Sequence, residues 1–64
     1  MKIVVTIPAY NEAGTIAAVI NKIHEVMEQN KYDYKILVVD DGSRDKTAEI
    51  AKKEGAVVYS HPKN

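Results

Sequence analysis

The chain has 64 residues, a formal net charge of zero and no cysteine. So short a chain forms one domain at most, or part of one. It is only marginally stable alone, because a domain of this size buries only about 60% of the surface that its unfolded form exposes. The charge balance removes any general attraction to nucleic acid or anionic lipid, and the missing cysteines exclude disulfides and thiolate metal sites. No apolar run is long enough to span a membrane or to form the core of a signal peptide. We therefore expect no nucleic-acid partner, no membrane span in this segment and a reducing, cytoplasmic location.

The first two predicted elements are a strand and a helix. Residues 2–7, K-I-V-V-T-I, are rich in β-branched side chains and predict a strand that stops at Pro8. Asn11 is the expected N-cap of the helix, and Asn30 is its expected end. The helix is predicted over residues 13–29, because apolar side chains recur there at spacings of three and four: Ile16, Val19, Ile20, Ile23, Val26 and Met27.

The next two predicted elements repeat this order. Residues 35–39, K-I-L-V-V, predict a second strand, and residues 45–54 predict a second helix. Ser43 or Asp45 is expected to cap the start of this helix. Gly55 stands where a glycine commonly follows the last helical turn.

A third strand is predicted over residues 56–60, A-V-V-Y-S, and residues 61–64 should leave the sheet because proline cannot continue a central strand. The order β-α-β-α-β predicts an α/β fold with a three-stranded parallel sheet in a Rossmann-like arrangement. Right-handed crossovers and the strand order 3-2-1 would put both helices on one face. The other face also carries apolar side chains, so we expect self-association through it, or its coverage by the rest of a larger domain.

Two unusual stretches follow the first two strands, P-A-Y-N-E at residues 8–12 and D-D-G-S at residues 40–43. Ligands of open α/β sheets bind outside the carboxyl ends of the strands, where neighbouring strands would bring these stretches side by side. Neither stretch contains a Walker lysine or a G-x-G-x-x-G run, so a phosphate cradle and a dinucleotide fingerprint are both missing. Carboxylates with one aromatic ring suit the uncharged end of a nucleotide instead.

Individual residues of these stretches have a binding interpretation and a structural one. Tyr10 offers a flat face for stacking a base, or it packs on its own loop. Glu12 and Asp41 offer carboxylates to ribose hydroxyls or to an imide N–H, although Glu12 also complements the dipole of the first helix. Asp40 belongs to the same site or is a loop carboxylate that caps the second helix. Gly42 permits a sharp turn or the close approach of a ligand.

The stretches V-T-I-P-A-Y-N-E-A-G-T-I and I-L-V-V-D-D-G-S-R-D-K-T resemble the opening of the family-two nucleotide-sugar glycosyltransferases, in particular the dolichyl-phosphate mannose synthase type. The resemblance spans essentially the whole chain, including A-V-V-Y-S-H-P-K-N. It implies a glycosyltransferase-A fold, of which residues 1–64 would be the N-terminal nucleotide-binding portion, and a UDP- or GDP-sugar donor.

The resemblance also implies roles for single residues. Asp41 would read the base and Asp40 would support the loop, while the first stretch would line the pocket. Gly42 and Ser43 belong to the same turn as the two aspartates. The predicted nucleotide-binding residues are Pro8, Ala9, Tyr10, Glu12, Asp40, Asp41, Gly42 and Ser43.

The catalytic parts of such an enzyme are missing from these 64 residues. The family continues with a D-x-D motif that holds Mg²⁺ or Mn²⁺ on the diphosphate and, later, a carboxylate general base. The sequence contains no D-x-D, and the adjacent pair Asp40 and Asp41 is not one. We therefore predict no catalytic residue and no metal ligand in this segment, a metal in the full-length parent, and no activity for the segment alone. The acceptor, a hydroxyl or a lipid phosphate, would fit a parent enzyme at the cytoplasmic face of a membrane.

Two other functions are compatible with parts of the sequence. The acidic pair after a strand also resembles the first strand of a response-regulator receiver, but there the pair follows the first strand rather than the second. That alternative also leaves P-A-Y-N-E without a role. The other alternative is a small α/β unit that acts only in assembly and binds no ligand.

Overall fold

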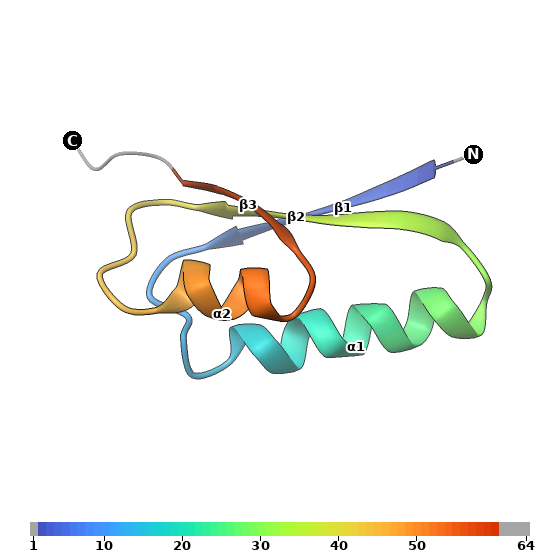
Figure 1. The fold of residues 1–64 in the computed structure, drawn as a ribbon, viewed down its shortest axis with the longest axis horizontal. Helices are drawn as coiled ribbons and strands as arrows, with labels where there is room; N and C mark the ends of the chain where they lie inside the picture. Colours follow the sequence, from blue (N-terminus) through green and yellow to red (C-terminus); the bar gives the residue numbers. More distant parts are fainter. Residues whose placement is uncertain (1, 61–64) are drawn as a thin grey trace.

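The computed structural model describes residues 2–60, and the predicted exit of residues 61–64 from the sheet lies outside this range. The described chain forms one sheet and two helices in the predicted order (Figure 1). None of the helices described is long and apolar enough to cross a membrane. The elements are β1 (Lys2–Ala9), α1 (Ile16–Gln29), β2 (Asp33–Asp40), α2 (Thr47–Lys53) and β3 (Val57–Ser60).

The three strands are parallel and lie in the order β1-β2-β3, which is the expected order 3-2-1 counted from the other edge. Ala9 pairs with Asp40, and Asp40 pairs with Ser60, so all three strands end at the same edge of the sheet. Both helices lie on one face of the sheet, as Figure 1 shows, and the predicted α/β architecture is confirmed.

Several predicted boundaries differ from the structure by one to three residues. β2 is longer than predicted at both ends, α2 is shorter at both ends, and β3 begins at Val57 rather than at residue 56. β1 does not stop at Pro8 but runs through it to Ala9, and Pro8 pairs with Val39. A proline is tolerated there because β1 is an edge strand of the described sheet, where a missing N–H can face away from the ladder. α1 begins at Ile16 rather than at residue 13, and its N-cap is Thr15, which makes no side-chain capping bond.

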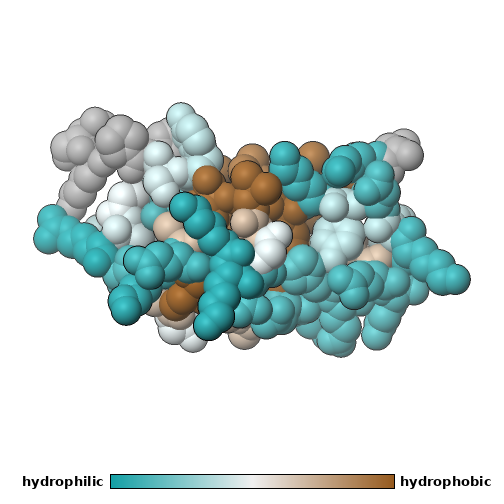
Figure 2. All heavy atoms as spheres, viewed as in Figure 1, coloured by the Kyte–Doolittle hydropathy of each residue, from teal (hydrophilic) through white to brown (hydrophobic). Residues whose placement is uncertain are grey.

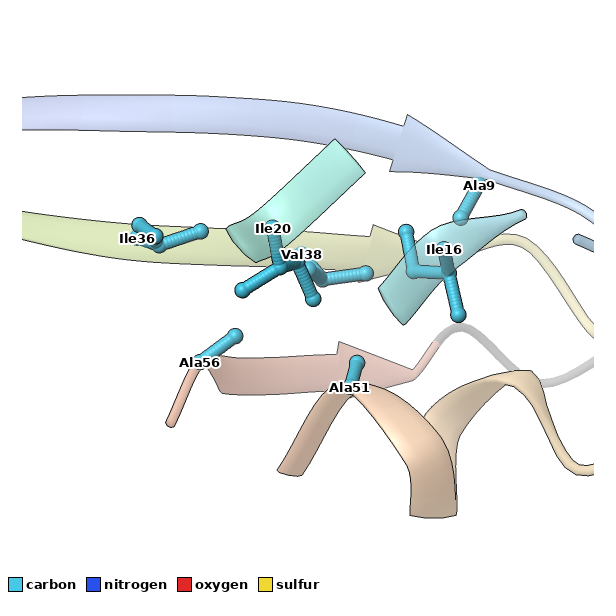
Figure 3. Packing of buried hydrophobic residues seen from close by; sticks show 7 residues of the cluster. All are labelled: Ala9, Ile16, Ile20, Ile36, Val38, Ala51 and Ala56. Carbon is cyan, nitrogen blue, oxygen red and sulfur yellow. The ribbon is translucent and has the colours of Figure 1, made fainter. Parts of the chain in front are cut away.

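The core lies between the sheet and the helices, and Figure 3 shows its members converging from α1, β2, α2, the end of β1 and the residue before β3. Ile20 and Val38 have no exposed surface at all. The predicted apolar stripe of α1 is wider than this contact, because Val19 and Val26 remain more than 40% exposed. The buried apolar residues are Ala9, Ile16, Ile20, Ile36, Val38, Ala51 and Ala56.

The second face of the sheet carries no helix within the described residues (Figure 1). Side chains alternate along a strand, and the register places Val4, Leu37 and Val57 on this face. Val4 and Val57 are about half exposed, at 55% and 48%. In Figure 2 hydrophobic atoms reach the surface along the sheet side, whereas the helix side is mainly hydrophilic. We call this apolar surface, with Val39 and Tyr59, the open face.

His24 of α1 packs at the end of the sheet opposite the carboxyl ends of the strands. Its Nε2–H donates to the carbonyl of Glu54 at 2.8 Å, and its ring meets that of Tyr34 edge to face at 5.6 Å. Gly55 follows α2 with φ 93°, in the position expected for a glycine, and a Cβ there would lie 3.3 Å from Nε2 of His24. His24 is thus a packing residue that joins the two helices.

Candidate functional site

The two predicted stretches meet at the carboxyl end of the sheet. We call residues 10–15 the first loop and residues 41–46 the second loop. Directly beyond the paired strand ends, the backbone N–H of Asp41 donates to the carbonyl of Ala9 at 2.9 Å. The first and second loops therefore leave the sheet side by side, as their position after neighbouring strands predicts.

A reciprocal pair of hydrogen bonds joins the loops at Asn11. The N–H of Asn11 donates to Oγ of Ser43 at 2.7 Å, and the N–H of Arg44 donates to Oδ1 of Asn11 at 2.8 Å. Asn11 has a left-handed backbone, with φ 52°, a conformation that asparagine tolerates better than most residues. The prediction that Asn11 is the N-cap of α1 is therefore wrong. Asn11 instead links the first loop to the second loop.

A second set of bonds joins the first loop to the start of α2. The N–H of Glu12 donates to Oγ1 of Thr47 at 2.8 Å, and the N–H of Ala13 donates to Oδ2 of Asp45 at 3.2 Å. Asp45 Oδ1 accepts the N–H of Thr47 at 3.0 Å and also its hydroxyl. The N-cap of α2 is Lys46, which makes no side-chain capping bond, so neither Asp45 nor Ser43 is the predicted cap. Asp45 precedes the cap and accepts the N–H of Thr47, whereas Ser43 bonds to the first loop.

Asp40 supports the second loop from inside. Its side chain is only 4% exposed, and its Oδ1 accepts the N–H of Ser43 at 3.2 Å. The bond closes the turn within the second loop and does not reach α2, so the helix-capping interpretation of Asp40 is wrong. Burial leaves this carboxylate little surface for a ligand.

The remaining predicted residues differ in how much surface they offer. Tyr10 is 46% exposed, and Glu12 and Asp41 are also exposed at this edge. Glu12 keeps acceptor capacity, because among residues 2–60 its carboxylate accepts a single hydrogen bond, from the hydroxyl of Thr15 at 3.1 Å. Gly42 has φ 78°, which the turn between the aspartates and Ser43 requires.

Pro8 and Ala9 form the strand end below these groups. Pro8 is exposed on the open face, whereas Ala9 is buried in the core at 4% exposure. Ala9 can therefore offer a ligand little more than its backbone. The structure places all eight predicted residues at one edge of the sheet, but it presents only some of their side chains to solvent.

The exposed side chains of this edge include the carboxylates of Glu12, Asp41 and Asp45 and the cations of Arg44 and Lys46. The carboxylates suit the hydroxyls and imide N–H of a nucleoside. Within residues 2–60 there is no enclosed pocket and no group of three His, Asp or Glu side chains arranged to hold a metal ion. The residues described do not fit a metal–diphosphate site.

Asp45 should make the stability of the chain depend on pH. Hydrogen bonds from the Thr47 hydroxyl, the largest cause, and from the backbone of Thr47 and Ala13 lower the pKa of this carboxyl below its usual value. Its contribution to folding is therefore present above about pH 4 and is lost as pH falls through the lowered pKa. We expect Asp45→Asn to reduce the free energy of unfolding at pH 7 but much less at pH 2.5, as urea titrations would measure. An equal loss at both values would contradict this coupling.

Comparison with known proteins identifies the family. The model of glycosyl transferase family 2 matches residues 4–64. An uncharacterized protein of Methanocaldococcus jannaschii is 48% identical over 61 residues, which cover 94% of this chain and 23% of the relative. An undecaprenyl-phosphate 4-deoxy-4-formamido-L-arabinose transferase of Pseudomonas fluorescens is 36% identical over 56 residues, covering 88% of this chain and 16% of the relative. The chain belongs to glycosyl transferase family 2.

Solved structures agree with this family and its fold. Mannosyl-3-phosphoglycerate synthase from Rubrobacter xylanophilus superposes with a TM-score of 0.85 at 38% identity, over 94% of this chain and 19% of that one. Glucosyl-3-phosphoglycerate synthase from Mycobacterium tuberculosis, in complex with Mn²⁺, UDP-glucose and phosphoglyceric acid, gives 0.75 at 38% identity, over 92% of this chain and 20% of that one. The sheet described above is part of a glycosyltransferase-A fold, and the chain spans less than a quarter of the proteins it matches.

Thr47 is a residue of this edge that was not predicted. Its side chain is completely buried and bonds to both the first and the second loop. A signal was available, because a threonine three and four residues before Ile50 and Ala51 falls on the apolar face of α2, where a polar side chain needs a partner. The identity of that partner, the backbone of Glu12, could not be deduced from spacing.

Proposed function

We propose that residues 1–64 form the nucleotide-binding portion of a glycosyltransferase that transfers a sugar from a UDP- or GDP-sugar to an acceptor hydroxyl or a lipid phosphate. The observation that carries the proposal is the meeting of the two loops, which leaves Tyr10, Glu12 and Asp41 exposed at one edge of the sheet. An aromatic face with two nearby carboxylates offers stacking and acceptors for the base and ribose. The UDP-glucose named in the Mycobacterium tuberculosis complex supports the class of donor.

The residues of the site would divide into contact groups and supports. Tyr10 would stack on the base, Asp41 would accept a hydrogen bond from it, and Glu12 would accept from ribose hydroxyls. Asp40 would act on the ligand indirectly, by holding the turn at Ser43. Pro8, Ala9 and Gly42 would lie beneath the bound nucleoside and let it approach the backbone.

The diphosphate and the catalytic step would be handled by parts of the parent enzyme beyond these residues. A divalent metal such as the Mn²⁺ named in the complex would stabilise the charge of the leaving diphosphate. We propose that this segment alone is inactive, because its sequence has no D-x-D motif to hold such a metal. A cytoplasmic location is part of the same proposal, with the parent at the cytoplasmic membrane face if its acceptor is a lipid phosphate.

A titration followed by NMR tests nucleotide binding. UDP and GDP would be added to the ¹⁵N-labelled chain up to millimolar concentration, with and without Mn²⁺. We expect amide shifts confined to residues 8–12 and 40–43, with little effect of the metal on this segment. The absence of shifts at millimolar nucleotide would favour the assembly-only alternative. A mass gain on Asp40 or Asp41 after treatment with acetyl phosphate would instead favour the receiver alternative.

Self-association through the open face is a further part of the proposal. Exposed valines on an uncovered sheet lose contact with water when two such faces meet, which stabilises the associated form. We expect sedimentation velocity to show a dimer or a larger species, and Val4→Lys to shift it toward the monomer. Val26→Lys changes an exposed valine on α1 instead, and the oligomeric state measured by sedimentation should not change. A well-folded monomer of the unmodified chain at high concentration would contradict self-association.

A further inference from the structure

Thr47 carries a buried hydroxyl at the point where both loops meet α2. The side chain has no exposed surface. Its Oγ1 accepts the N–H of Glu12 at 2.8 Å and donates its own proton to Oδ1 of Asp45. A buried hydroxyl without partners would be costly, so this arrangement satisfies the oxygen as acceptor and as donor.

The direction of these bonds follows from the chemistry of their members. The ionised carboxylate of Asp45 can only accept, and it receives the hydroxyl and N–H of Thr47 on Oδ1 and the N–H of Ala13 on Oδ2. The hydroxyl proton is thus committed to Asp45, and a lone pair of Oγ1 is left for the N–H of Glu12. The hydroxyl of Thr47 and the carboxylate of Asp45 thus accept hydrogen bonds from the N–H groups of residues 12 and 13, more than thirty residues away in the sequence.

The hydrogen bonds of Asp45 and Thr47 affect the distance between Glu12 and Asp41, the two carboxylates proposed to bind the ligand. Glu12 is tied by its own N–H to the start of α2, and Asp41 is tied by its N–H to the carbonyl of Ala9. Glu12 and Asp41 are like charges at one edge, so they favour separation of the loops that carry them. The hydrogen bonds to Thr47 and Asp45 oppose that separation, and binding to two groups at once depends on their relative position.

We propose that Asp45 and Thr47 are positioning residues, which hold the first loop at the distance from Asp41 that a nucleotide requires and do not themselves touch the ligand. This inference rests on the proposed nucleotide-binding function. Asp45 and Thr47 differ from Asn11 and its partners, because Thr47 is fully buried and Asp45 carries a charge.

Substitutions at position 47 test the proposal. Thr47→Val keeps the shape and removes the hydroxyl, whereas Thr47→Ser keeps the hydroxyl and removes a methyl group. Two quantities would be measured by NMR: the hydrogen-exchange protection of the Glu12 amide, and the dissociation constant for UDP or GDP, whichever binds. We expect Thr47→Val to lose the protection and to weaken binding about tenfold, and Thr47→Ser to retain most of both.

The outcomes separate this inference from the function on which it rests. Binding of nucleotide by the unmodified chain together with unchanged affinity in a folded Thr47→Val variant would overturn the positioning role alone. Failure of the unmodified chain to bind either nucleotide would overturn the proposed function and the positioning role with it. If Thr47→Val does not fold, Asp45→Asn replaces it. A folded Asp45→Asn variant with weakened binding supports the proposal, and one with unchanged affinity overturns it.

Discussion

Replacing Ile20 by alanine is expected to unfold most of the chain at 25 °C. Ile20 is completely buried between α1 and the sheet, where Figure 3 shows it over Val38. Removing such a side chain from a core costs about 2–5 kcal/mol, because transfer energy is lost and a cavity remains. A core in a chain of this size rarely supplies more than about 3–5 kcal/mol, so little or no stability would be left. Circular dichroism during urea unfolding would measure the loss.

The matched control for this substitution is Val19→Ala on the same helix. Val19 belongs to the predicted apolar stripe but is 43% exposed, so its truncation removes fewer contacts and leaves no cavity. We expect its cost to stay below about 1 kcal/mol. Equal destabilisation by the two substitutions would mean that the packing of α1 on the sheet differs from that described here.

Replacing Asp41 by asparagine is expected to weaken nucleotide binding by about 10- to 100-fold. A hydrogen bond to a charged group contributes roughly 1.5–3 kcal/mol, and each 1.4 kcal/mol corresponds to a factor of ten in affinity. Asp41 is exposed, and its known bond in the described chain is made by its backbone N–H to Ala9, which the substitution preserves. Stability should therefore change little, and the NMR titration would measure the effect on affinity.

Asp33→Asn is the control for Asp41→Asn. Asp33 is also an exposed aspartate of the β2 region, but it stands at the opposite end of that strand, 4.0 Å from Nζ of Lys2. Its neutralisation changes the net charge by the same amount without altering the proposed site. Equal affinity of the two variants for nucleotide would show that the effect of Asp41 is general electrostatics or that Asp41 does not contact the ligand.

Most of the architecture could be predicted from local patterns. β-branched runs mark the strands, and the four-and-three spacing of Ile16, Ile20 and Ile23 marks the first helix, because burial of one face requires that periodicity. The order of the elements then predicts a parallel sheet with both crossings on one side, as observed. Helix starts were less predictable, since α1 begins only after a turn in which the carbonyl of Glu12 accepts the N–H groups of Thr15 and Ile16.

The candidate site was predictable in its place but not in its bonding. The sequence predicts that Tyr10, Glu12 and Asp41 follow neighbouring parallel strands, and parallel strands end at a common edge. It also supplied residue types that cap backbone N–H groups, such as Asn11 and Ser43. Which N–H group each of these side chains accepts depends on contacts between the two loops.

The physical reason is that a side-chain oxygen accepts whichever donor lies within about 3 Å, regardless of its distance along the chain. Local rules therefore assigned Asn11 to α1 and Ser43 to α2, whereas the pairing of β1 with β2 brings each of them to the opposite loop. Thr47 of α2 is buried where the two loops meet, and its hydroxyl accepts the N–H of Glu12 in the first loop.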